Sequence, residues 1–65
     1  MECSQKEIRL FNADSLEYSG SIMVTGSEWE FKNVNDAHLI KMTTGMPLKA
    51  VMVCLISYNL VYEIH

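Results

Sequence analysis

The stretch LKAVMVCLISYNLVYEI, residues 48–64, is the strongest structural signal in the chain. Every even-numbered residue in it is apolar, and no charged residue lies between Lys49 and Glu63. A segment of this composition must bury at least one face, and a 65-residue chain has little else to bury it against. The stretch is therefore informative about how the chain folds and self-associates, and not about any reaction it catalyses.

Two conformations compete for this stretch. As a helix that begins at Pro47, it would carry one apolar stripe. The members of that stripe are Leu48, Val51, Met52, Leu55 and Ile56. As a strand, it would place the even positions on one face, and its β-branched residues favour that conformation. One strand over the whole stretch would be about three times the usual 5–6 residues. We therefore predict a strand for 60–64 and leave 48–57 open, with strand preferred over helix.

Turn-forming residues divide the rest of the chain into short segments. They occur at residues 12–15, 19–21, 25–27, 33–36 and 43–47. Gly, Asn, Asp and Pro supply the backbone conformations that turns require. Short segments between closely spaced turns favour strands over long helices. Residues 6–11, 16–24 and 27–33 are therefore predicted as strands, with a hairpin at 25–27 and a bulge at Gly20.

One short helix is expected before the C-terminal stretch. Asn35 or Asp36 can cap its start and Gly45 its end, which places it near residues 36–44. The predicted fold class is α+β and mainly antiparallel β, in a single small domain over residues 1–65. It consists of an N-terminal β-meander, the short helix and a C-terminal strand. The alternative is an all-β small barrel, because the strand–turn–bent-strand pattern of residues 8–22 resembles barrels of the Sm or SH3 type.

Charge and composition narrow the class of protein. The net charge is −3, and residues 1–36 hold seven of the eight acidic residues, whereas 37–62 hold none. No Lys/Arg cluster of the kind that binds nucleic acid is present in the sequence, so a nucleic-acid partner is disfavoured. The uncharged stretch 50–62 is shorter than the roughly 20 residues of a membrane-spanning helix, so no membrane association is expected. We expect a soluble, cytoplasmic protein.

The cysteine and histidine residues do not form a recognisable site. Cys3 and Cys54 are the only two cysteines, fewer than small disulfide-stapled domains usually contain, and we expect both to be free thiols in a reducing compartment. His38 and His65 have no metal-ligand spacing relative to each other or to the cysteines. We predict no metal, no cofactor and no catalytic residue, and therefore no enzyme.

Self-association is the leading functional hypothesis. The chain has more apolar residues than one small core needs, and it has no motif for chemistry. We expect a small non-catalytic regulatory or interaction protein that acts through protein–protein contact as a homodimer. Leu55, Ile56 and Trp29 are the candidate interface residues. Trp29 is also the largest candidate for the core, because it alternates with charged residues in the same predicted strand.

A nucleic-acid-binding regulator is the alternative hypothesis. A helix-turn-helix at about residues 36–59 would have a turn at Gly45-Met46 and a second helix from Pro47. Lys41 and Lys49 would be its candidate nucleic-acid contacts. The second helix would offer few polar side chains to bases or phosphates, and the chain is acidic, so this hypothesis ranks second.

Overall fold

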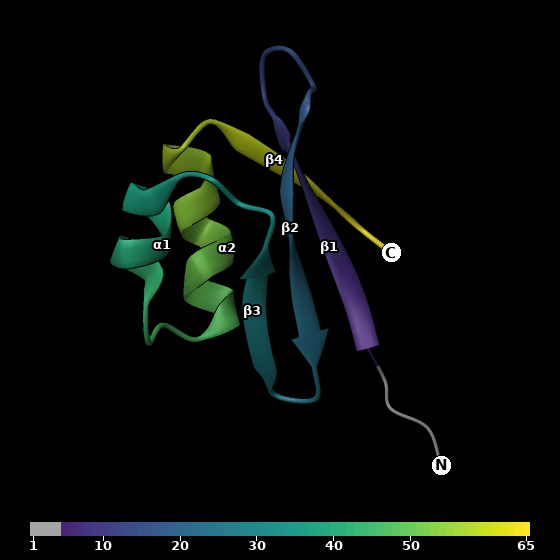
Figure 1. The fold of residues 1–65 in the computed structure, drawn as a ribbon, viewed down its shortest axis with the longest axis vertical. Helices are drawn as coiled ribbons and strands as arrows, with labels where there is room; N and C mark the ends of the chain where they lie inside the picture. The colour runs from purple at the N-terminus through teal and green to yellow at the C-terminus, as the bar shows by residue number, and fades with distance from the viewer. Residues whose placement is uncertain (1–4) are drawn as a thin grey trace.

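Four strands and two helices share one core in a computed structural model of the protein (Figure 1), which describes residues 5–65. In chain order they are β1 (Gln5–Asn12), β2 (Tyr18–Thr25), β3 (Glu28–Lys32), α1 (Ala37–Thr43), α2 (Leu48–Ser57) and β4 (Leu60–Ile64). The predicted α+β class, with an N-terminal meander, a short helix near 36–44 and a C-terminal strand, is confirmed. Neither helix in the described part of the chain is long and apolar enough to cross a membrane.

The strands form one open antiparallel sheet in the order β3-β2-β1-β4. Both helices lie on the same side of this sheet (Figure 1). The sheet does not close, because β3 and β4 stand at opposite edges and the helices provide the apolar cover that a barrel obtains from further strands. The barrel alternative is therefore not supported.

Two glycines shape the meander, as predicted. Gly26, with φ +62°, begins the two-residue turn between Thr25 and Glu28, which closes the β2–β3 hairpin. The register between β1 and β2 shifts by one residue beside Gly20, so the predicted bulge is confirmed. A Cβ at Gly20 would lie 2.6 Å from Cγ2 of Val34, so this position has no room for a side chain.

Helix α1 begins and ends through side-chain hydrogen bonds. Oδ1 of Asp36 accepts the backbone N–H groups of His38 and Leu39 at 3.0 and 3.1 Å, which confirms one of the two predicted caps. At the other end, the hydroxyls of Thr43 and Thr44 donate to carbonyls one turn back. These bonds compete with continuation of the helix, which stops before Gly45.

The preference for a strand over residues 48–57 is wrong, because these residues form helix α2. Val51 and Leu55, four residues apart on one side of the helix, are fully buried against the sheet. Val53 and Ile56 lie on another side and are exposed. The 3.6-residue period therefore prevails over the even–odd alternation, since the sheet needs an apolar layer on its inner face more than it needs a fifth strand.

The core lies between the inner face of the sheet and the two helices. Its buried apolar members are Ile8, Leu10, Ile22, Leu39, Val51 and Leu55. Trp29 is half-buried at the margin of this core, where its ring packs edge-to-face on Phe31 with centroids 5.1 Å apart. Its Nε1 donates to the carbonyl oxygen of Met46 at 2.9 Å. Trp29 therefore ties the β3 edge to the turn between the helices.

Substitution of Trp29 tests how much these contacts contribute to the free energy of unfolding. Trp29→Ala should lower the free energy of unfolding by about 3 kcal/mol, through lost apolar burial and the lost hydrogen bond. Trp29→Phe retains most of the packing and should lose about 1 kcal/mol, the contribution of one hydrogen bond. Urea unfolding followed by circular dichroism measures both values, and a Trp29→Ala variant as stable as the wild type would contradict the assignment of Trp29 to the core.

The turn between β1 and β2 contains a strained residue. Leu16 has φ +63°, a conformation that costs a residue with a Cβ roughly 1–2 kcal/mol. Leu16→Gly should therefore raise the free energy of unfolding by about 0.5–1 kcal/mol, after the entropy of glycine in the unfolded chain is subtracted. Leu16→Ala, which keeps the Cβ, is the matched control in the same urea experiment. An equal gain in both variants would assign the effect to removal of the exposed leucine side chain.

Candidate interaction surface

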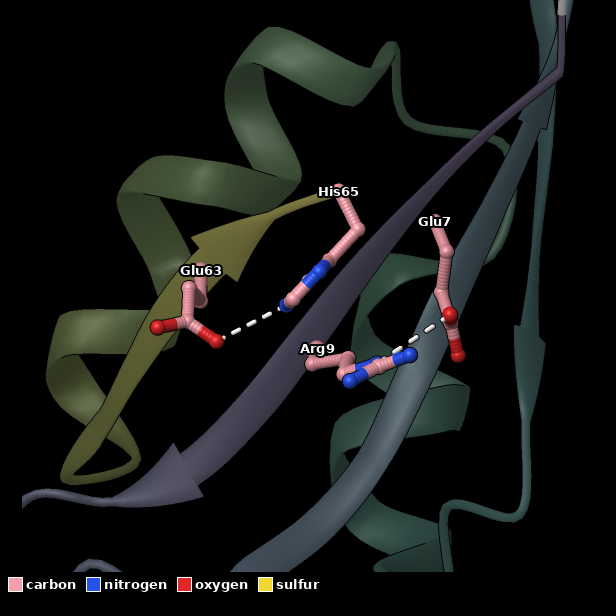
Figure 2. Close-up of polar contacts among 4 residues, drawn as sticks. All are labelled: Glu7, Arg9, Glu63 and His65. Carbon is pink, nitrogen blue, oxygen red and sulfur yellow. Dashed lines mark hydrogen bonds and ion pairs between the residues drawn. The ribbon is translucent and has the colours of Figure 1, made fainter.

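The outer face of the sheet, on the side away from the helices, carries one ion pair and one histidine–carboxylate hydrogen bond among residues 5–65 (Figure 2). Nε of Arg9 lies 3.1 Å from Oε1 of Glu7 along β1, and Nε2 of His65 lies 2.8 Å from Oε1 of Glu63 along β4. Arg9 is opposite Glu63 in the β1–β4 register, so acidic and basic side chains alternate along and across the two strands. Such partly exposed pairs contribute about 1 kcal/mol or less each. Each pair joins residues two apart in the same strand segment, so neither one links β4 to β1.

The described residues offer no site for a metal ion. Between Gln5 and His65 no three or more His, Cys, Asp or Glu side chains lie close enough to hold one. Cys54 is half-buried on α2, and Cys3 lies outside the described residues, so the prediction for Cys3 is not addressed.

Several of the exposed apolar side chains lie on α2 and β4. The α2–β4 face, as we name it, consists of Val53, Ile56, Leu60, Tyr62 and Ile64. Val53 is 67% exposed, Ile56 78%, Tyr62 48% and Ile64 58%. Four members, all except Ile64, line one shallow groove together with Met52, Leu55 and Val61. No charged residue lines this groove, so it is suited to contact with another apolar surface.

The α2–β4 face adjoins an unpaired strand edge. Glu7 and His65 exchange two backbone hydrogen bonds, His65 N to Glu7 O at 2.8 Å and Glu7 N to His65 O at 3.4 Å. Bonded and non-bonded residue pairs alternate along an antiparallel ladder. Val61 and Glu63 therefore also direct their backbone groups toward β1.

The backbone groups of the other β4 residues point away from β1. The N–H and C=O groups of Leu60, Tyr62 and Ile64 are directed to the open edge of the sheet. These groups have no hydrogen-bond partner within residues 5–65. Edge strands are usually protected by charge, proline or a bulge, and Glu63 is the one charged residue of β4. This edge is therefore open to a further strand.

The candidate residues from the sequence divide between core and surface. Leu55 is fully buried beneath α2, whereas its neighbour Ile56 is the most exposed of the large apolar residues. Trp29 is on β3, at the opposite edge of the sheet from β4. The structure therefore brings only Ile56 of the three to the α2–β4 face.

The two lysines of the alternative hypothesis are exposed but lie on different helices. Lys41 is on α1 and Lys49 is in the first turn of α2. The helices do follow each other closely, with four residues between them, as in a helix-turn-helix. The exposed side of α2, however, continues from Lys49 to the apolar Val53 and Ile56.

Sequence reasoning did not identify Val53, Tyr62 and Ile64 as site residues. Val53 had a usable signal, because it follows Lys49 by four residues and precedes Ile56 by three, which puts all three on one side of a helix. Tyr62 and Ile64 fall in the strand predicted for 60–64, but the position of that strand at the sheet edge depends on pairing with β1. No local pattern contains that information.

Comparison with known proteins gives no further guide to function. No protein-family model, curated protein or solved structure matches the chain.

Proposed function

We propose that this is a non-catalytic interaction protein with a regulatory role, which acts through protein–protein contact and forms a homodimer through the α2–β4 face. The observation that carries the proposal is the contiguous apolar surface at an open strand edge, at Val53, Ile56, Tyr62 and Ile64. An exposed patch of this kind usually marks a contact site. The proposed compartment is the cytoplasm, which the paucity of cysteine supports.

Symmetry favours a second copy as the occupant of this face. In a two-fold dimer, each residue of the patch contributes twice, once from each chain. Burial of the area that Val53, Ile56, Tyr62 and Ile64 leave exposed would contribute on the order of 1 kcal/mol per side chain. No charged residue lines this groove, so two copies that meet there do not bring like charges into direct contact.

The same surface favours a protein partner over a nucleic-acid partner. A recognition helix contacts DNA through donors and cations on its exposed side. The exposed side of α2 presents Val53 and Ile56, with Lys49 as its one cation. Apolar side chains gain more from an apolar partner than from a phosphate backbone, which supports the protein–protein proposal.

Two adjacent residues provide a matched test of the dimer. Ile56→Glu should leave the fold intact, because this side chain is 78% exposed, but should convert the dimer to monomer by placing a charge in the interface. Leu55→Glu should unfold the protein, because Leu55 is fully buried. Sedimentation velocity at micromolar concentration measures the first effect and circular dichroism the second. A wild-type chain that remains monomeric at millimolar concentration would refute the homodimer.

Titration with random duplex DNA tests the alternative function. With this charge balance, we expect binding at physiological salt no tighter than roughly 10⁻⁴ M, the weak end of non-specific affinities. A Lys41→Ala/Lys49→Ala double variant should bind equally weakly. Sub-micromolar binding that decreases steeply with salt, and that this double variant loses, would favour the helix-turn-helix function instead.

A further inference from the structure

We infer that two copies of this chain pair their β4 strands antiparallel across a two-fold axis at Tyr62, so that the dimer contains one continuous eight-stranded sheet. This inference rests on the proposed homodimer and specifies how it is built. It follows from the direction of the backbone groups of β4, from the side chains on each face of that strand, and from the position of α2 beside it.

The backbone groups of β4 select the register. Leu60, Tyr62 and Ile64 present their N–H and C=O groups at the open edge. An antiparallel pair centred on Tyr62 places Tyr62 opposite its own copy and Leu60 opposite the second copy's Ile64. Each of these residues is then in a bonded pair, so every outward group between Leu60 and Ile64 finds a partner.

Other symmetric registers satisfy fewer groups. An axis at Val61 pairs Leu60 with the second copy's Tyr62, but leaves Ile64 opposite Tyr58, which lies outside the strand. An axis at Glu63 brings two carboxylates directly opposite each other, which is destabilising, and removes Leu60 from the ladder. The register centred on Tyr62 has neither defect, because it places Glu63 opposite the second copy's Val61.

The side chains of β4 are compatible with a central position in a larger sheet. Leu60, Tyr62 and Ile64 share the inner face, and all are apolar or aromatic. On the outer face, Val61 is 43% exposed and lies opposite Phe11 in the sheet. The inner face of β4 is thus wholly apolar and suits a position beneath a helical layer, while Glu63 shares the outer face with Val61.

Helix α2 extends the same interface into the second layer. The chain passes directly from α2 into β4 through Tyr58 and Asn59 (Figure 1). Val53 and Ile56 line the groove beside Leu60 and Tyr62, on the inner side of the sheet. Continuation of the sheet through β4 therefore brings the two α2 helices toward each other, and their exposed Val53 and Ile56 side chains cover the joint between the strands.

The opposite edge, β3, is less suited to pairing with itself. Alternation through the sheet leaves Trp29 and Phe31 as the β3 residues whose backbone groups point outward. The two-fold register that uses both of them is centred on Glu30 and places that carboxylate opposite its own copy. The β4 edge has no such repulsion at its centre.

Hydrogen exchange, measured by NMR on the intact wild-type chain, tests the register residue by residue. As the concentration is raised through the dimerisation range, the amides of Leu60, Tyr62 and Ile64 should become protected by roughly tenfold or more. The amides of Val61 and Glu63 already bond to β1 and serve as internal controls, whose protection should change far less. A dimer in which the three outward amides remain unprotected would refute β4 pairing while leaving the homodimer of the proposed function intact.

A proline substitution provides the second test. Tyr62→Pro removes an N–H group that the monomer does not use, and proline is tolerated on an edge strand whose N–H faces solvent. We expect a folded monomer, with the dimer dissociation constant raised roughly a hundredfold or more. Tyr62→Val, which keeps the N–H group and the strand preference, is the control and should retain most of the dimer.

The possible outcomes separate the two proposals. Loss of the dimer in Ile56→Glu and Tyr62→Pro, but not in Tyr62→Val, supports the β4-paired dimer. Loss in Ile56→Glu with a Tyr62→Pro dimer as tight as wild type refutes β4 pairing only. A wild-type monomer at millimolar concentration refutes both proposals. If Tyr62→Pro unfolds, the exchange of the three outward amides in the wild type decides the question.

Discussion

The fold depends on one constraint, the need to cover the inner face of a sheet whose central strands carry Leu10 and Ile22. Both residues are fully buried, and the cover comes mainly from Val51 and Leu55 of α2 and from Leu39 of α1. The chain has no other apolar segment of similar length that could provide this layer. Residues 48–57 therefore form the covering helix, although their composition also suits a strand.

The placement of α2 then determines the position of β4. Asn59 adopts φ +59° and reverses the chain directly after the helix. Its carbonyl accepts the N–H of Ala13, and its Nδ2 donates to Oδ2 of Asp14 at 2.9 Å. These contacts attach the end of α2 to the β1–β2 turn, so the following residues pair with β1 and become an edge of the sheet. The open edge is thus a consequence of how the core is covered.

Much of this architecture could be predicted from local sequence, and the remainder depends on tertiary contacts. Gly26, Gly20 and Asp36 each act through their own backbone conformation or side chain, so the hairpin, the bulge and the start of α1 follow from the sequence. Residues 48–57 could not be assigned in this way, because alternation and helical periodicity coincide over a mostly apolar run. Only the packing of Val51 and Leu55 on the sheet decides between them.

The candidate site was harder to predict than the fold for the same reason. Leu55 and Ile56 are indistinguishable by composition, yet the helix directs one into the core and the other into solvent. Exposed and buried apolar residues become separable only when the helix phase is known. The unpaired groups of Tyr62 likewise exist only because β4 is the last strand of the sheet.

The stability of this small fold and its proposed association both depend on how its apolar residues are covered. One small core covers the sheet but leaves the outer side of α2 and the edge of β4 without apolar neighbours. A larger domain would enclose these residues with a further helix or strand of its own. In the proposed homodimer, a second copy provides an equivalent layer, because the Val53, Ile56 and β4 edge of one protomer contact the same residues of the other. In the proposed homodimer, the second chain covers the apolar surface that one small core leaves exposed.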